Sequence, residues 1–217
     1  MKKLLLLGIM LLGIVGGVKA QETEIEYLPG DPISLESIVS ESKLVSIGGT
    51  DQTMLYGLVN DGSQWGSNQI KLTSIQVAMN LISGDDNTSY QFRITKATDA
   101  DLVMPEGITT LYRIKAFKKD GETPYTGPGW NGENSYYLND IGWTYNVVPA
   151  DNYDNGCFFG ITSIDGKENT YKITSYKKDG SMVKENIYDK NEWVFYVVKE
   201  QSVPIKRVVQ PMTKFSP

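Results

Sequence analysis

The chain has 217 residues, with 21 Lys and Arg, 26 Asp and Glu, no histidine and one cysteine. Without histidine, neither a Ser-His-Asp or Cys-His nucleophile nor a histidine-ligated metal site can form, and one cysteine excludes an intrachain disulfide and a four-cysteine metal site. We therefore expect a protein that is not an enzyme and holds no metal or cofactor. The one enzyme class left open is a hydrolase that uses two carboxylates.

The first 20 residues have the pattern of a secretory signal peptide. Lys2 and Lys3 precede an uncharged apolar run at residues 4–18, and Val18-Lys19-Ala20 has short side chains at the positions that a signal peptidase reads. Such a run is too short to span a hydrocarbon core of ~30 Å. We expect bacterial export to the periplasm or the exterior, with cleavage before Gln21.

The exported chain is acidic. Removal of Lys2, Lys3 and Lys19 leaves 18 basic and 26 acidic residues, a net charge of −8. An acidic surface repels phosphate backbones and anionic lipids, so we expect no nucleic-acid partner. No later segment approaches 18 consecutive apolar residues, and we expect no membrane span.

Residues 21–42 are predicted to be a leader that precedes the main domain. Residues 21–30 show no apolar periodicity. Asp31 is a suitable N-cap and Pro32 suits the first helical position, which predicts one or two helical turns over residues 33–39.

Residues 43–200 have the pattern of a single all-β domain. Short apolar or alternating runs recur about every ten residues, separated by Gly-, Asn- and Asp-rich turns. The predicted strands are 43–47, 54–59, 69–72, 75–81, 90–96, 111–117, 136–138, 143–148, 157–163, 171–176, 182–186 and 193–198. The apolar positions change parity between Leu72 and Ile75, which indicates a bulge or a break. Residues 201–217 are predicted to be an extended or disordered tail.

Two kinds of internal similarity relate these strands. Residues 112–121 and 171–180 are both strand-like and both end in Lys-Lys-Asp-Gly, which predicts an Asp-Gly hairpin turn. The segments that begin at Tyr90, Trp143 and Trp193 share an aromatic-x-aromatic-x-aliphatic pattern and lie 53 and 50 positions apart. This spacing predicts three groups of four strands, each closed by one of these segments. The two Lys-Lys-Asp-Gly copies are 59 positions apart, so we expect them at different places within their groups.

Three groups of four strands over residues 43–200 resemble the β-trefoil superfamily, especially its ricin-type, lectin-like modules. The Gln-x-Trp signature of ricin-type modules is absent from this chain. The resemblance implies a β-trefoil domain that binds carbohydrate; a β-sandwich is the alternative fold. It also loosely suggests Asp120 and Asp179 as sugar ligands, although a hairpin turn alone explains both.

Two tryptophans lie in polar, glycine-rich loops at residues 61–68 and 127–134, and an asparagine follows each of them three or four positions later. These loops offer few apolar neighbours to bury an indole. An exposed aromatic ring can stack on the C–H face of a sugar, while nearby amides bind its hydroxyls. The predicted ligand-binding residues are Trp65, Asn68, Tyr125, Trp130, Asn131 and Asn134, with Tyr136, Tyr137 and Tyr188 as secondary candidates. Alternatively, the indoles fold back over the core.

The remaining aromatic and sulfur residues are predicted to be structural. Trp143, Trp193 and Cys157 begin or lie in strand-like runs, and we expect them to pack in the core.

The predicted function is a secreted, non-catalytic module that binds a carbohydrate or glycoprotein. The alternative is a protein-binding domain such as a hydrolase inhibitor, with residues 123–129 as its exposed loop.

Overall fold

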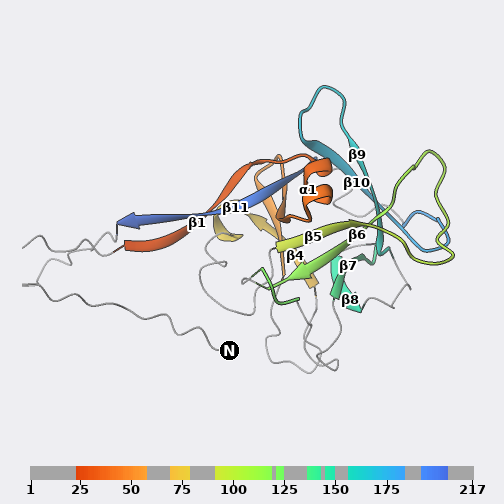
Figure 1. Cartoon of the computed structure of the whole chain (residues 1–217), viewed down its shortest axis with the longest axis horizontal. Helices are drawn as coiled ribbons and strands as arrows, with labels where there is room; N and C mark the ends of the chain where they lie inside the picture. The colour runs from red at the N-terminus through yellow and green to blue at the C-terminus, as the bar shows by residue number, and fades with distance from the viewer. Residues whose placement is uncertain are drawn as a thin grey trace, which may run out of the picture. The chain divides into compact units, whose positions relative to one another are not determined.

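The computed structural model describes residues 23–57, 69–78, 91–118, 121–124, 136–142, 145–149, 156–183 and 192–204 (Figure 1). Contacts divide the chain into two units. Ile25–Gln201 forms one; the other, Met1–Glu24 with Ser202–Pro217, contributes only the ends of two strands to the described residues. The predicted signal peptide, residues 1–20, lies outside them.

The described part of Ile25–Gln201 is mainly antiparallel β-structure, which confirms the all-β prediction. Its elements are β1 Thr23–Pro32, α1 Leu35–Glu41, β2 Leu44–Gly49, β3 Thr53–Gly57, β4 Gln69–Ser74, β5 Gln91–Lys96, β6 Tyr112–Phe117, β7 Tyr136–Asp140, β8 Tyr145–Pro149, β9 Phe158–Ser163, β10 Thr170–Tyr176 and β11 Trp193–Pro204.

Six of these strands form a closed ring of antiparallel pairs. The order around the ring is β2, β5, β6, β9, β10 and β11, and β11 pairs with β2 to close it. Strand β1 also pairs with β11. No strand edge within the ring therefore lacks a partner strand.

Three consecutive segments of the chain, residues 44–96, 112–163 and 170–204, each supply two strands of the ring. In the first two segments a hairpin stands between the ring strands, β3–β4 after β2 and β7–β8 after β6. In the third, β10 is followed by an isolated bridge from Tyr176 to Met182, and residues 184–191 lie outside the described residues.

The main core fills the inside of the ring. Every ring strand contributes two buried side chains at positions i and i+2, the period at which side chains share one face of a strand. These pairs are Val45 and Ile47, Phe92 and Ile94, Ile114 and Ala116, Phe159 and Ile161, Tyr171 and Ile173, and Trp193 and Phe195. The prediction that Trp193 packs in the core is confirmed. Cys157 is also buried, in a second cluster with Leu111 and Phe158. Trp143 lies outside the described residues.

Helix α1 confirms the predicted helical turns, but it begins later than expected. Its N-cap is Ser34, whose Oγ accepts a hydrogen bond from the amide of Ser37 at 3.2 Å. The predicted N-cap, Asp31, instead belongs to β1 with Pro32, and the amide of Ile33 donates to the carbonyl of Phe195 at 2.9 Å. Pairing with β11 thus extends the strand through the position where the local pattern predicts a cap.

The strand predicted at residues 75–81 is wrong over its described part. Residues 75–78 form a helical turn. The hydroxyl of Ser74 accepts a hydrogen bond from the amide of Val77 at 3.3 Å, as an N-cap does. The change of parity after Leu72 therefore marks the end of β4 and the start of this turn.

The predicted grouping of the strands is also wrong in one group. The segment that begins at Trp143 supplies β8, a hairpin strand, whereas β9 closes the second segment in the ring.

The two Lys-Lys-Asp-Gly copies occupy equivalent places, contrary to the prediction, because they follow the ring strands β6 and β10. In both, the glycine amide donates to the first lysine carbonyl at 3.0 Å, from Gly121 to Lys118 and from Gly180 to Lys177. The segments differ in length, so constant spacing does not identify equivalent strands.

Candidate functional site

The six residues predicted to bind ligand, Trp65, Asn68, Tyr125, Trp130, Asn131 and Asn134, lie outside the described residues. Their prediction stays open, as does that of Tyr188 and Asp120. Asp179 is described, and its carboxylate accepts a hydrogen bond from the amide of Ser181 at 2.9 Å. A hydrogen bond from the Ser181 hydroxyl, and then the one from its amide, lower the pKa of Asp179. These contacts are those of a turn aspartate.

A pocket of about 360 Å³ lies on the outer side of the ring, where β5 ends and β6 begins. We call it the Arg113 pocket. Since Ile94 and Ile114 point into the core, the neighbouring residues Thr95 and Arg113 point outward, and they are cross-strand partners. The lining consists of Thr95, Lys96, Ala97, Thr98, Asp99, Arg113 and Tyr137.

A buried ion pair forms one wall of the Arg113 pocket. Arg113 Nη1 lies 3.0 Å from Asp99 Oδ1, and the two side chains are only 7% and 15% exposed. The guanidinium carbon lies 4.3 Å from the centre of the Tyr137 ring and 5.3 Å from that of Phe158. Arg113 is thus held by charge and by two aromatic faces, and it fixes both Asp99 and Tyr137 in turn.

A second cavity, of about 610 Å³, lies between α1 and the ring. It is lined on one side by helix residues that include Leu35 and Val39, and on the other by Tyr112 and Tyr171. The hydroxyl of Tyr171 accepts a hydrogen bond from the amide of Leu35 at 2.8 Å. Burial and the neighbouring Tyr171 raise the pKa of Tyr112. This cavity is more apolar than the Arg113 pocket.

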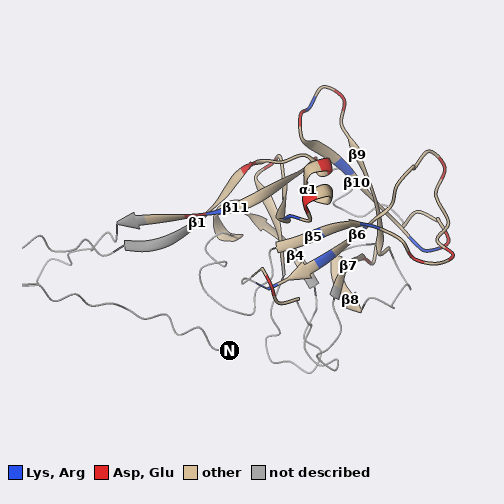
Figure 2. Cartoon of the chain, in the orientation of Figure 1, with Lys and Arg blue, Asp and Glu red and all other residues tan. Residues whose placement is uncertain are grey.

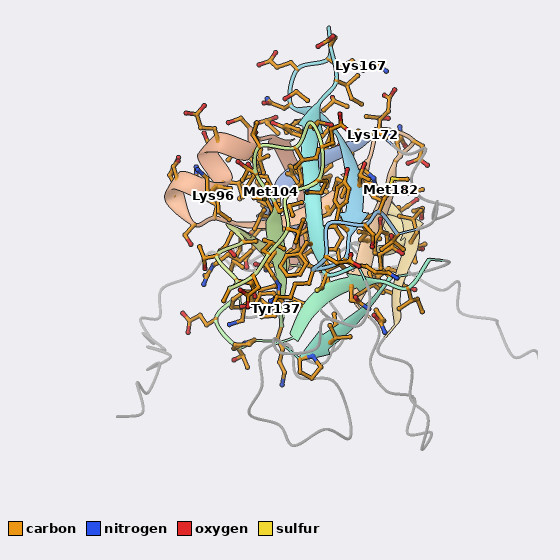
Figure 3. The ribbon with its side chains drawn as sticks, turned by 90° about the vertical axis from the view of Figure 1, so that its right-hand side faces the viewer. Lys96, Met104, Tyr137, Lys167, Lys172 and Met182 are labelled. Atoms are coloured by element: carbon orange, nitrogen blue, oxygen red, sulfur yellow. The ribbon has the colours of Figure 1, made fainter. Side chains whose placement is uncertain are left out.

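Lys96 belongs to the lining of both cavities, which are therefore neighbours. In Figure 3 Lys96 lies beside α1, and Tyr137, a residue of β7, lies lower in the view.

Neither a metal-holding cluster nor a membrane-spanning helix occurs in the part of the chain that the structure describes. No group of three or more His, Cys, Asp and Glu residues there could hold a metal ion. No helix among these residues is long and apolar enough to cross a membrane.

Cys157, which directly precedes β9, is buried, and burial raises the pKa of its thiol to about 11, although the charge of Arg113 opposes this. In the unfolded chain the thiol has a pKa near its ordinary value of 9.0. The burial therefore contributes stability in full below pH 9, and that contribution is lost as the pH rises from 9 towards 11.

We expect Cys157 to resist alkylation in the folded protein, because only an exposed thiolate reacts. Iodoacetamide should label less than about a tenth of the native chains at neutral pH, and nearly all chains in urea. Mass spectrometry of the two samples measures this. Rapid labelling of the native protein would contradict the burial of the thiol.

Of the residues that line the Arg113 pocket, the sequence indicated only Tyr137, as a secondary candidate. Arg113 stands next to an apolar position in the alternating run of β6, and this is the one sequence signal that indicates its outward position. Nothing in the sequence pairs Arg113 with Asp99, which is 14 positions away.

Comparison with known proteins finds no matching family model, no similar curated protein and no similar solved structure.

Proposed function

We propose that this chain is a secreted, non-catalytic carbohydrate-binding module with a β-trefoil fold. The fold proposal is supported by the six-stranded ring, to which three consecutive segments each contribute two strands. A β-trefoil has this plan, with a hairpin between the two barrel strands of each repeat. A closed ring also favours a barrel over a sandwich, which consists of two separate sheets.

The Arg113 pocket is the observation that carries the functional proposal. Its lining combines one aromatic ring, a carboxylate, a guanidinium, an ammonium group and two threonines, with Ala97 as the aliphatic residue. A sugar has hydroxyls that need fixed polar partners and a C–H face that packs on an aromatic ring. The volume of about 360 Å³ is at the small end of ligand pockets, which suits one or two sugar rings.

The rigid wall matters for affinity. Because the ion pair to Asp99 and the ring of Tyr137 hold Arg113 in place, little side-chain ordering remains to be done when a ligand binds. Trp65 and Trp130 remain proposed stacking platforms for a larger glycan. Export rests on the signal-peptide pattern of residues 1–20.

A glycan-array screen of residues 21–217 tests the function, and two substitutions of Tyr137 test the site. We expect Tyr137→Ala to weaken glycan binding at least about tenfold, equivalent to about 1.4 kcal/mol, because the stacking ring is lost. Tyr137→Phe keeps the ring and should bind within about threefold of the wild type. Isothermal titration calorimetry with the strongest array ligand measures both.

A Trp65→Ala, Trp130→Ala double variant serves as the comparison. If Tyr137→Ala binds glycan as the wild type does and the double variant does not, the binding site lies in the loops that hold Trp65 and Trp130. Absence of any glycan binding would contradict the proposed function and favour the protein-binding alternative. Circular dichroism of each variant establishes that it is folded.

A further inference from the structure

Positive charge is concentrated on two adjacent strands of an acidic protein. Strands β5 and β6 carry four basic residues, Arg93, Lys96, Arg113 and Lys115, and no acidic residue. The whole chain has a net charge of −5. Figure 2 shows basic residues on β6 and acidic residues on α1. The ion pair with Asp99 compensates Arg113, so three of the four charges remain.

Arg93 and Lys115 are directly opposite each other on the outer face of this strand pair. Their neighbours Phe92, Ile94 and Ile114 point into the core, so both basic side chains point outward. Directly paired residues have Cβ atoms only ~4.5–5.5 Å apart, and like charges on directly opposite residues are destabilising. Both side chains are half-buried, which weakens the screening of that repulsion by water.

No described carboxylate offsets these two charges. Neither residue forms an ion pair with an acidic residue that the structure describes. Both instead lie over the ring of Phe117, the Arg93 guanidinium carbon at 4.6 Å and the Lys115 ammonium at 5.3 Å from its centre. Arg93 Nε is buried and has no hydrogen-bond partner among the described residues.

The state of Lys115 agrees with this geometry. Burial, and then the charge of Arg93, lower the pKa of the ammonium group. An anion placed between the two side chains would oppose both effects, because its negative charge stabilises the protonated ammonium group. Stability alone does not account for two cations on one aromatic ring, whereas binding of an anion does.

The basic pair borders the Arg113 pocket. Lys115 is the cross-strand partner of Tyr137. Arg93 and Lys115 each stand two positions along their strands from a pocket residue, Thr95 and Arg113, a distance of about 7 Å. A ligand in the pocket can therefore reach the pair with a neighbouring substituent.

We propose that the glycan bound at the Arg113 pocket is acidic, and that Arg93 and Lys115 bind its carboxylate or sulfate group. The inference rests on the proposed carbohydrate-binding function and assigns the ligand class. Tyr137, Thr95 and Thr98 contact the sugar ring and its hydroxyls, while the basic pair selects the charged substituent.

Calorimetry with three matched tetrasaccharides tests the proposal: neutral galactose, galacturonic acid and sulfated galactose. We expect an acidic probe to bind at least about tenfold more tightly than the neutral one, and added salt to weaken only the acidic probes. The preference between carboxylate and sulfate identifies the group. An Arg93→Gln, Lys115→Gln variant should lose at least about tenfold for the acidic probe and keep its affinity for the neutral one.

The control is a Lys172→Gln, Lys177→Gln variant, which removes the same charge at exposed positions on and after β10. It should bind all three probes as the wild type does. Equal affinity for neutral and acidic probes, or equal losses in the two variants, would overturn the proposal while the carbohydrate-binding function stands. Failure of all three probes and of the glycan array would overturn both. Since the test variant removes a repulsion, it should unfold at the same urea concentration as the wild type or a higher one.

Discussion

Replacement of Arg113 by alanine is expected to lower the free energy of unfolding by about 3–5 kcal/mol. The substitution leaves the Asp99 carboxylate without its guanidinium partner at a site where its side chain is only 15% exposed. It also removes the contacts of the guanidinium with Tyr137 and Phe158. Urea denaturation followed by tryptophan fluorescence measures the change.

A second variant separates the buried charge from the loss of packing. Arg113→Met with Asp99→Leu replaces both charges by apolar groups of similar size, and it should recover most of the stability lost in Arg113→Ala. The pair of half-buried Lys43 and exposed Glu41 is the control, since Lys43→Ala should cost less than about 1 kcal/mol. A loss below about 1 kcal/mol in Arg113→Ala would contradict the structural role assigned to the pair.

Replacement of Phe195 by alanine is expected to cost about 3–5 kcal/mol of unfolding free energy. The Phe195 side chain is fully buried inside the ring, and its centre lies 5.2 Å from that of Tyr171 on the neighbouring strand. The truncation leaves a cavity at the place where β11 closes the ring onto β2, where the backbone pairing limits collapse.

Val197 provides a matched control on the same strand. It is 37% exposed, so Val197→Ala should change stability by less than about 0.5 kcal/mol. Thermal and urea unfolding of the two variants, compared with the wild type, measure the difference. Similar losses at both positions would contradict the burial of the Phe195 side chain inside the ring.

The ring strands could be predicted from the sequence where one face is apolar and the other polar. In β5 and β6 the alternation is clear, and the predicted bounds differ from the observed ones by one residue. In β9 both faces are buried, with Phe159 in the main core and Phe158 in the second cluster. The sequence of β9 therefore lacks the alternation that marks a ring strand. The segment at Trp143 alternates more regularly, and for this reason the sequence predicts, incorrectly, that it closes the second group of strands.

Pairing between distant segments could not be predicted. Strand β1 has little apolar periodicity of its own and is a strand because β11 offers an edge beside it. The same limitation applies to the site. Tyr137 could be named from its type, but Asp99 meets Arg113 only because the connection after β5 folds back beside β6. The basic pair Arg93 and Lys115 depends on a register that a single strand does not reveal.

Closure of the ring between β11 and β2 has a consequence for how the chain acquires its structure. The residues paired at this junction, Gly49 and Trp193, are 144 positions apart. Until β11 has been synthesised and has paired, the edge of β2 that pairs with β11 has no partner strand, and the inward side chains of β2 and β10 lack those of β11 as neighbours. Contacts of such long sequence separation slow folding. Closure of the ring is thus a late, all-or-none step in folding that depends on β11.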